Sequence, residues 1–352
     1  VSKENSISPP ITFESSNFSN CLSFSFYSSH SIYIKKDGSA YAIGNNNEKQ
    51  IHGKYPPILK NWTQIQIKDN NNKNYKFISA VCGVGYTLYL LKSNQPKNPP
   101  LLAYQSNYFN SPFIIKTDKI EIKAIFGGRN NAAAIDENGT ILILNSKILS
   151  SPERQPIYSF LPNFRKISQV ACLHKSIIAL STNGQLYQYC LDNAVNNPYF
   201  IPIDHDPGIK FVKISGTWEH LLAISDKGKI YGQGVNHFGH LGVDKPKNIS
   251  QLMKIPTLSS HNIIDISAGS FHSLFLDDNG YVYSCGNNKS GELMLPNPSK
   301  EPVLIPKKSL ASNATFCIAG FNFSIAFINH VLPKYLPNQL ISWGDQKKFY
   351  FK

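Results

Sequence analysis

Short hydrophobic runs alternate with glycine-containing turns along much of the chain, a spacing typical of β-hairpins. In the clearest stretch, residues 263–295, an apolar run at 273–276 precedes Asp278, Asn279 and Gly280, and a second run follows at 281–285. Asn and Gly adopt positive φ at little cost, so this pattern predicts two antiparallel strands joined by a tight turn.

The hairpin recurs along the chain as an internal repeat. Residues 211–244 match 263–295 nearly position for position, and weaker copies begin at Ser28 and Gly127. In the best copies a His lies eight positions before the turn Gly, and a second Gly follows the turn six positions later. These repeat positions, which we interpret as structural, are His30, Gly38 and Gly44, then His220, Gly228 and Gly234, and finally His272, Gly280 and Gly286.

Seven such units fill the chain, with anchor positions at 30, 86, 131, 176, 220, 272 and 323. A period near 50 residues with room for four strands predicts an all-β, seven-bladed β-propeller that forms a single domain over residues 1–352. Joining the chain ends would protect the edges of the ring, so residues 11–18 are expected to pair with 340–344. Insertions are expected at 54–76, 92–100, 191–210 and 330–338.

The repeat residues resemble those of a known family. In the best copy the matching positions are Ala268, Gly269, His272, Gly280, Tyr283, Gly286, Asn288, Gly291 and Leu293. This pattern is similar to the repeat of the regulator of chromosome condensation (RCC-type) family, whose members are seven-bladed propellers. The resemblance implies the fold but no single function, because the family includes nucleotide exchange factors, ubiquitin-ligase modules, photoreceptors and cytoskeletal scaffolds.

The loops before the anchor positions bear on exchange activity. The resemblance implies that an exchange factor for the small GTPase Ran presents acidic residues there. In this chain Glu219 is the one acidic residue in those loops, while Arg129 and Lys175 bring positive charge. This electrostatic difference argues against the same partner, so the chain is expected to be no enzyme, with exchange on a Ran-like GTPase as the alternative.

The same loops carry aromatic residues, which are typical protein-binding hot spots. The predicted partner-binding residues are Trp218, Glu219, Phe271, Phe321, Arg129 and Lys175. The alternative interpretation is that one or more of these rings packs inward between blades.

The chain is strongly basic, with a formal net charge of +13 and a pI near 9.3. Such a charge attracts nucleic acid, anionic lipid or acidic protein surfaces such as tubulin. Lys and Asn are abundant throughout, however, including the stretch 68–76, so the charge indicates a compositional bias. Nucleic acid is not the expected partner, and a chromatin-associated propeller stays a further alternative.

No cofactor or metal is expected. The chain has no phosphate-binding loop, and its six cysteines form no C-x-x-C pair. His237 with His240, and Asp204 to Asp206, are more simply explained as turn residues than as metal ligands.

These observations predict a non-enzymatic scaffold for protein partners within a larger assembly. Scattered cysteines and the lack of an apolar stretch near 20 residues predict a soluble, intracellular protein. We expect a location in the cytoplasm or cytoskeleton, including a cilium or flagellum, with the nucleus as the alternative. Tubulin or another cytoskeletal protein is the candidate partner, and a small GTPase is the alternative.

Overall fold

The chain folds into β-sheets that have the order of a propeller. The computed structural model describes residues 11–13, 21–27, 29–93, 95, 98–115, 117, 120–145, 157–161, 165–192, 199–244, 247–296, 300–328 and 339–345. These residues form seven antiparallel sheets of four strands each. The prediction of an all-β, seven-bladed β-propeller is confirmed. The chain divides into two compact units, 20–203 with 348–352 and 1–19 with 204–347.

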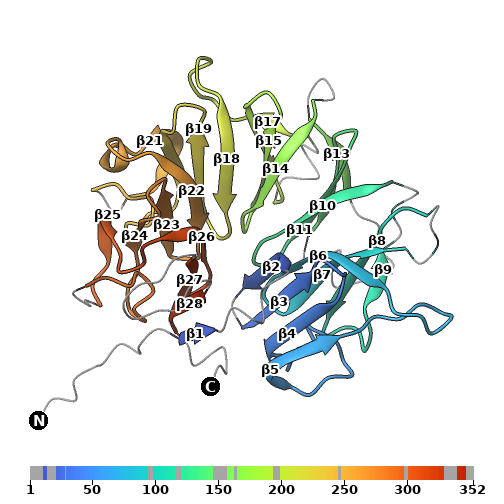
Figure 1. Cartoon of the computed structure of the whole chain (residues 1–352). Coiled ribbons are helices and arrows are strands. Elements are labelled where there is room, and N and C mark those ends of the chain that lie inside the picture. Colours follow the sequence, from blue (N-terminus) through green and yellow to red (C-terminus); the bar gives the residue numbers. More distant parts are fainter. Residues whose placement is uncertain are drawn as a thin grey trace, which may run out of the picture. The chain divides into compact units, whose positions relative to one another are not determined.

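The unit that begins at Asn20, here called the first unit, holds four sheets (Figure 1). In sheet order its strands are β2 (Cys21–Tyr27), β3 (His30–Lys35), β4 (Ala40–Asn45) and β5 (Ile58–Ile65); β6 (Lys76–Cys82), β7 (Tyr86–Lys92), β8 (Leu101–Ser106) and β9 (Phe113–Ile115); β10 (Ile122–Gly127), β11 (Ala132–Asp136), β12 (Thr140–Leu144) and β13 (Ile157–Phe160); and β14 (Ile167–Cys172), β15 (Ser176–Ser181), β16 (Leu186–Cys190) and β17 (Ile201–Pro202).

The second unit holds the other three sheets. Its strands are β18 (Phe211–Gly216), β19 (His220–Ser225), β20 (Ile230–Gly234) and β21 (Ile249–Lys254); β22 (Ile263–Ala268), β23 (His272–Asp277), β24 (Val282–Gly286) and β25 (Val303–Lys308); and β26 (Ala314–Ala319), β27 (Phe323–Ile328), β28 (Gln339–Gly344) and β1 (Ile11–Phe13). A short 3-10 helix, η3 (Pro256–Leu258), follows β21.

The last sheet of the second unit is completed by the start of the chain. Strand β1 pairs antiparallel with β28, with Ile11 opposite Ser342 and Phe13 opposite Leu340 (Figure 1). The expected pairing of the N-terminal stretch with residues 340–344 is therefore confirmed over three residues. Residues 14–18 of that stretch lie outside the described residues.

The repeated glycines follow from backbone geometry. Gly280 has φ +78° in the turn between β23 and β24, a conformation that side chains disfavour. Gly286 has φ +110°, and a Cβ there would lie 2.5 Å from the carbonyl oxygen of Phe271. The second motif glycine therefore lets the end of β24 approach the loop that precedes β23.

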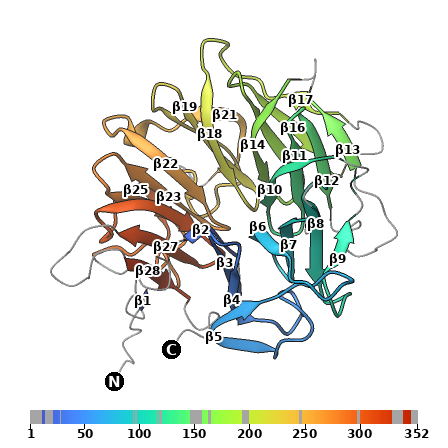
Figure 2. The same cartoon turned by 45° about the vertical axis from the view of Figure 1, so that its right-hand side comes forward.

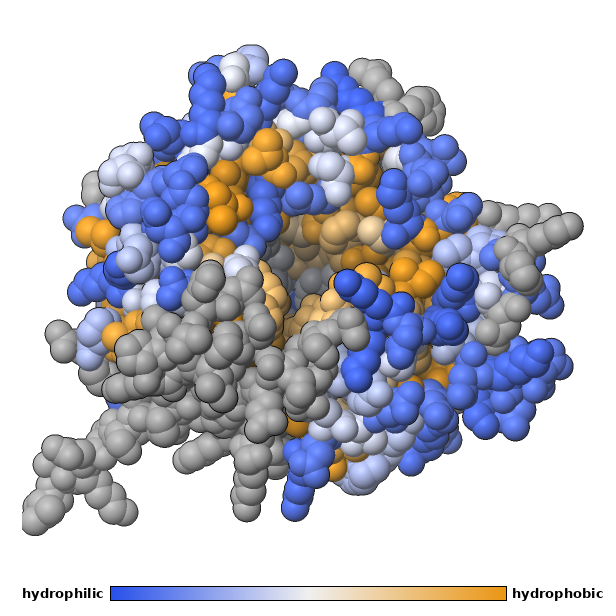
Figure 3. Space-filling view, in the orientation of Figure 1, coloured by the Kyte–Doolittle hydropathy of each residue, from blue (hydrophilic) through white to orange (hydrophobic). Residues whose placement is uncertain are grey.

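Hydrophobic side chains fill the space between neighbouring sheets within each unit. In the second unit Leu222 and Ile224 of β19 pack in one cluster with Phe275 of β23 and Tyr283 of β24. Burying a large apolar side chain stabilises a fold by about 1.5–3 kcal/mol, so these clusters hold adjacent sheets together. Hydrophilic residues dominate the outer surface in the space-filling view (Figure 3).

The segments expected as insertions have mixed structures. Segment 54–76 contains β5, and its Trp62 ring packs 4.8 Å from that of Tyr33. Segment 191–210 contains β17, although 193–198 lie outside the described residues, as do 94, 96 and 97 of segment 92–100 and all of 330–338. No helix among the described residues has the length and apolar character needed for a bilayer span.

Candidate functional site

Four aromatic rings meet at the loops of the second unit. Phe271 is at the centre, with ring centroids 6.1 Å from Trp218, 5.6 Å from Phe238 and 5.7 Å from Phe321. Each of the four side chains is partly exposed. We call these residues the aromatic loop cluster. The rings pack on one another, and each side chain keeps part of its surface exposed. Their role in binding a partner stays a prediction.

Backbone hydrogen bonds order the loops that carry these rings. The amide of Asn287 donates to the carbonyl of Phe271 at 2.8 Å, and the amide of Val235 donates to that of Glu219 at 2.9 Å. The Thr217 hydroxyl donates to the Gly269 carbonyl at 2.9 Å, which joins two neighbouring loops. The aromatic loop cluster therefore rests on a backbone that is already ordered.

Phe238, which lies in the loop after the third strand of its sheet, is not among the residues predicted from the sequence. Its neighbours His237 and His240, which the sequence singles out as turn residues, are exposed and buried, respectively. The sequence does show an aromatic residue in the loop after β20. It does not show that this ring contacts Phe271, because the two residues are 33 positions apart and belong to different repeats.

The predicted charged residues are divided between the two units. Glu219 lies beside Trp218 and is half-buried. Arg129 and Lys175 lie in the corresponding loops of the first unit. The exposed Lys175 ammonium is 3.7 Å from the Asp192 carboxylate, and the Arg129 carbonyl accepts a hydrogen bond from Val84 at 2.9 Å. Within the second unit, the structure thus brings together the rings of Trp218, Phe271 and Phe321. Glu219 is the chain neighbour of Trp218.

The motif histidines form a recurrent contact between sheets. His220 Nε2 lies 3.0 Å from Ser273 Oγ, and this hydroxyl donates to the His240 carbonyl at 2.6 Å. Because the hydroxyl hydrogen is used in that way, the imidazole must donate from Nε2. Burial lowers the pKa of His30 and of His272 to about 3, so these rings stay neutral. A neutral, buried donor is suited to structure and unsuited to acid–base chemistry near pH 7.

Other side chains make an equivalent contact where the motif His is replaced. The Tyr86 hydroxyl lies 2.9 Å from the Gly128 carbonyl and 2.7 Å from that of Asn131. The side-chain amide of Asn131, through Nδ2, in turn donates to the Leu173 carbonyl at 2.6 Å. The anchor position therefore reaches the next sheet even in the weaker repeats.

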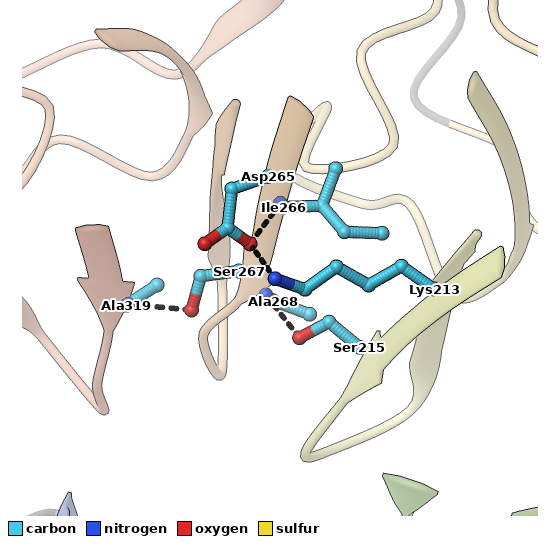
Figure 4. A network of polar contacts seen from close by, with 7 residues as sticks. All are labelled: Lys213, Ser215, Asp265, Ile266, Ser267, Ala268 and Ala319. Carbon is cyan, nitrogen blue, oxygen red and sulfur yellow. Dashed lines mark hydrogen bonds and ion pairs between the residues drawn. The ribbon is translucent and has the colours of Figure 1, made fainter. Parts of the chain in front are cut away.

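The inner strands of the second unit are joined by a polar network (Figure 4). Lys213 Nζ of β18 lies 2.5 Å from Asp265 Oδ1 of β22. Nearby, Ser215 Oγ accepts from the Ala268 amide at 2.9 Å, and Ser267 Oγ accepts from the Ala319 amide at 2.8 Å. These contacts link adjacent strands of three sheets. No group of three potential metal-binding side chains occurs in the described parts of the chain.

Comparisons with known proteins show what the repeat is similar to. The model of the regulator of chromosome condensation (RCC1) repeat matches residues 227–276 and 263–292. The chain is 26% identical over 193 residues to the ultraviolet-B receptor UVR8 of Arabidopsis thaliana, covering 49% of this chain and 43% of the receptor. It is 28% identical over 164 residues to the guanine nucleotide exchange factor SRM1 of Saccharomyces cerevisiae, covering 44% of this chain and 33% of that protein.

Solved structures share the fold across nearly the whole chain. Human WBSCR16 superimposes with a TM-score of 0.69 at 12% identity, covering 92% of this chain and 86% of that one. Prp20p of Saccharomyces cerevisiae superimposes with a TM-score of 0.67 at 13% identity, covering 93% of this chain and 84% of that one. At these identities the likeness shows the fold alone. The sequence matches span less than half the length of the two curated relatives.

Proposed function

We propose that this chain, an RCC1-type seven-bladed β-propeller, is a non-enzymatic protein-binding module that contacts its partner through the aromatic loop cluster. The observation that carries the proposal is the convergence of Trp218, Phe238 and Phe321 on Phe271. Aromatic residues dominate binding energy at protein interfaces because they bury much area with few rotatable bonds.

The order of these loops supports the same proposal. Their carbonyl groups already accept hydrogen bonds from neighbouring strands and loops, as at Phe271 and Glu219. A surface that is ordered before binding loses less conformational entropy when the partner arrives. Contacts with the partly exposed rings therefore contribute more to the binding free energy than the same contacts in disordered loops would.

Guanine nucleotide exchange is the second candidate function. It is favoured by the similarity to the exchange factor SRM1, and Prp20p, which shares the fold, has binding properties to Gsp1p and histones. Against it stands the charge of the loops, where Glu219 is accompanied by Arg129 and Lys175. A nucleotide-release assay with a Ran-like GTPase distinguishes the two, since a binding module leaves the intrinsic release rate unchanged.

A nuclear or cytosolic protein partner accords with these relatives, and histone binding by Prp20p keeps the chromatin alternative open. None of the relatives cited above is named as a tubulin-binding or ciliary protein. Tubulin and a ciliary location therefore stay expectations from the sequence and do not enter the proposed function.

Site-specific crosslinking tests the proposed contact. Benzoylphenylalanine at position 271 should capture a specific protein in native extract, and the same group at Tyr199, which is 70% exposed in the first unit, is the matched control. Captured bands common to both positions, or none at 271, would contradict the proposal. Loss of the specific band on Trp218→Ala in the same chain would support the cluster as the surface.

A further inference from the structure

A pocket of about 410 Å³ opens among loops of the first unit. The sheets β2–β5 and β6–β9 adjoin (Figure 2). Most residues that line the pocket belong to these two sheets and their loops. The residues that determine its chemistry are Glu48, Gln50, Val84, Gly85, Tyr104 and Tyr108.

The pocket occupies the repeat position that Phe238 fills in the second unit. Asn46 Oδ1 accepts from the amide of Ile51 at 2.9 Å, and Asn236 Oδ1 accepts from that of Leu241 at 2.8 Å. This shared hydrogen bond makes Glu48 the equivalent of Phe238, since each follows the Asn by two residues. The position that holds the apolar ring of Phe238 in the second unit thus holds the carboxylate of Glu48 in the first.

A glycine supplies the space. Gly85 precedes the anchor at 86 as Phe271 precedes the anchor at 272, so the two are equivalent. Among the described residues, the one atom within 4 Å of a Cβ added at Gly85 would be the Glu48 Cβ, at 3.9 Å. The volume that the Phe271 ring takes up in the aromatic loop cluster is therefore open in the first unit.

The lining combines one negative charge with apolar faces. Glu48 is exposed and makes no ion pair with any residue in the described ranges. The ammonium of neighbouring Lys49 is held 2.7 Å from Asn110 Oδ1. Gln50 is 1% exposed, and its Oε1 has no hydrogen-bond partner among the described residues. Tyr108 and Val84, which are 62% and 40% exposed, add an aromatic and an aliphatic surface.

We propose that this pocket binds a lysine or arginine side chain of a protein partner. The charged head group would pair with the Glu48 carboxylate, and the methylene stem would lie against Tyr108 and Val84. Charge complementarity favours this occupant, because the Glu48 carboxylate has no ion-pair partner among the described residues and the neighbouring Lys49 ammonium is held by Asn110. The proposal deepens the proposed function by naming a partner side chain, but it uses a different unit from the aromatic loop cluster.

Small probes test the pocket without a known partner. We would titrate the whole chain with the methylamides of N-acetyl-arginine and N-acetyl-lysine, and follow the Gly85 amide resonance by NMR. N-acetyl-norleucine methylamide has a similar stem without the charge. Both cations should shift the resonance and bind about fivefold more tightly than norleucine, a ratio equivalent to about 1 kcal/mol.

Variants place the interaction at the pocket. Glu48→Gln should remove the preference for cations, while Glu121→Gln, a change of the same charge at another exposed glutamate of this unit, should retain it. Gly85→Asn should abolish binding, because Asn tolerates the φ of +68° there and fills the space.

Three results would overturn the pocket proposal: equal binding of norleucine, no binding of either cation, or a preference for cations that survives Glu48→Gln. Because the probes report on the first unit and crosslinking at position 271 reports on the second, failure of one proposal is distinguishable from failure of the other.

Discussion

The imidazole of His272 donates from Nε2 to the hydroxyl of Ser324 at 2.8 Å, and so joins two neighbouring sheets of the second unit. The same hydroxyl donates to the Glu292 carbonyl at 2.8 Å, which fixes the loop after β24. In the first unit His30 and Thr87 make the equivalent contact at 2.8 Å. In each unit, therefore, one motif residue contacts a hydroxyl of the neighbouring sheet, and this hydroxyl binds the loop after the third strand of the motif residue's own sheet.

Removing the hydroxyl tests the energetic weight of this contact. Ser324→Ala leaves His272 Nε2 as a buried donor without an acceptor, so the free energy of unfolding should fall by about 2 kcal/mol. Urea unfolding at pH 7.5 measures the change as a lower midpoint with an unchanged slope. Ser260→Ala, at an exposed serine, should alter stability by less than about 0.5 kcal/mol. Equal effects of the two variants would show that the hydroxyl contact contributes little.

Buried histidines should make the fold acid-sensitive. Burial lowers the pKa of His30 and of His272 to about 3 and that of His240 to about 4, from an ordinary value of 6.5. A lowered pKa means that the unfolded chain binds more protons than the folded one between these values. The stabilisation is therefore complete above pH 6.5 and is lost as the pH falls below it, by about 2 kcal/mol per buried ring at pH 5.

Unfolding midpoints between pH 7.5 and 5 measure this loss. His272→Gln keeps a side-chain donor but cannot be protonated, so the dependence on pH should become shallower in this variant. Gln251→Ala, which removes an exposed side chain that cannot titrate, should leave the dependence unchanged. If His272→Gln shows the same pH dependence as the unmodified chain, the imidazole is not the group that titrates.

Glu292 should act in the opposite direction. Burial raises the pKa of this carboxyl to about 7 from 4.5, although the Ser290 amide donates to it at 2.7 Å. The folded chain then holds a proton that the unfolded chain has released, so this stabilisation exists at low pH and is lost as the pH rises from 4.5 to 7. Glu292→Gln should therefore raise the free energy of unfolding at pH 8, by at most about 3 kcal/mol.

The local structure favours this substitution. Asn287 Nδ2 donates to one oxygen of Glu292, and Asn287 Oδ1 is buried without a partner among the described residues. Rotation of the Asn287 amide would allow the side-chain amide that Glu292→Gln introduces to donate to Oδ1. Thermal unfolding at pH 5 and pH 8 checks the expectation, since the gain should be confined to the higher pH. A loss of stability at both pH values would show that the carboxylate is required as an ion.

The sequence predicted the parts of the fold that depend on local geometry. The turn at Gly280 and the pairing of the N-terminal stretch with β28 follow from φ preferences and from the need to cover a sheet edge. The contacts of Phe238 and the space at Gly85 could not be predicted in this way, because each depends on which residue the neighbouring sheet presents. The sequence shows that Glu48 replaces Phe238 and that Gly85 replaces Phe271 in the equivalent repeat positions. That these positions face one another follows only from the contact between neighbouring sheets.

Truncating the central ring should separate binding from folding. Phe271→Ala removes contacts to three aromatic neighbours, so partner capture through position 218 should fall at least about tenfold, as for a hot-spot residue. The half-buried ring should contribute only about 1 kcal/mol to stability, so the thermal midpoint should shift by a few degrees. Benzoylphenylalanine at position 218 measures capture with and without the Phe271→Ala change, and Tyr199→Ala in the same chain is the control. Unchanged capture in the Phe271→Ala chain would show that the partner binds elsewhere on the surface.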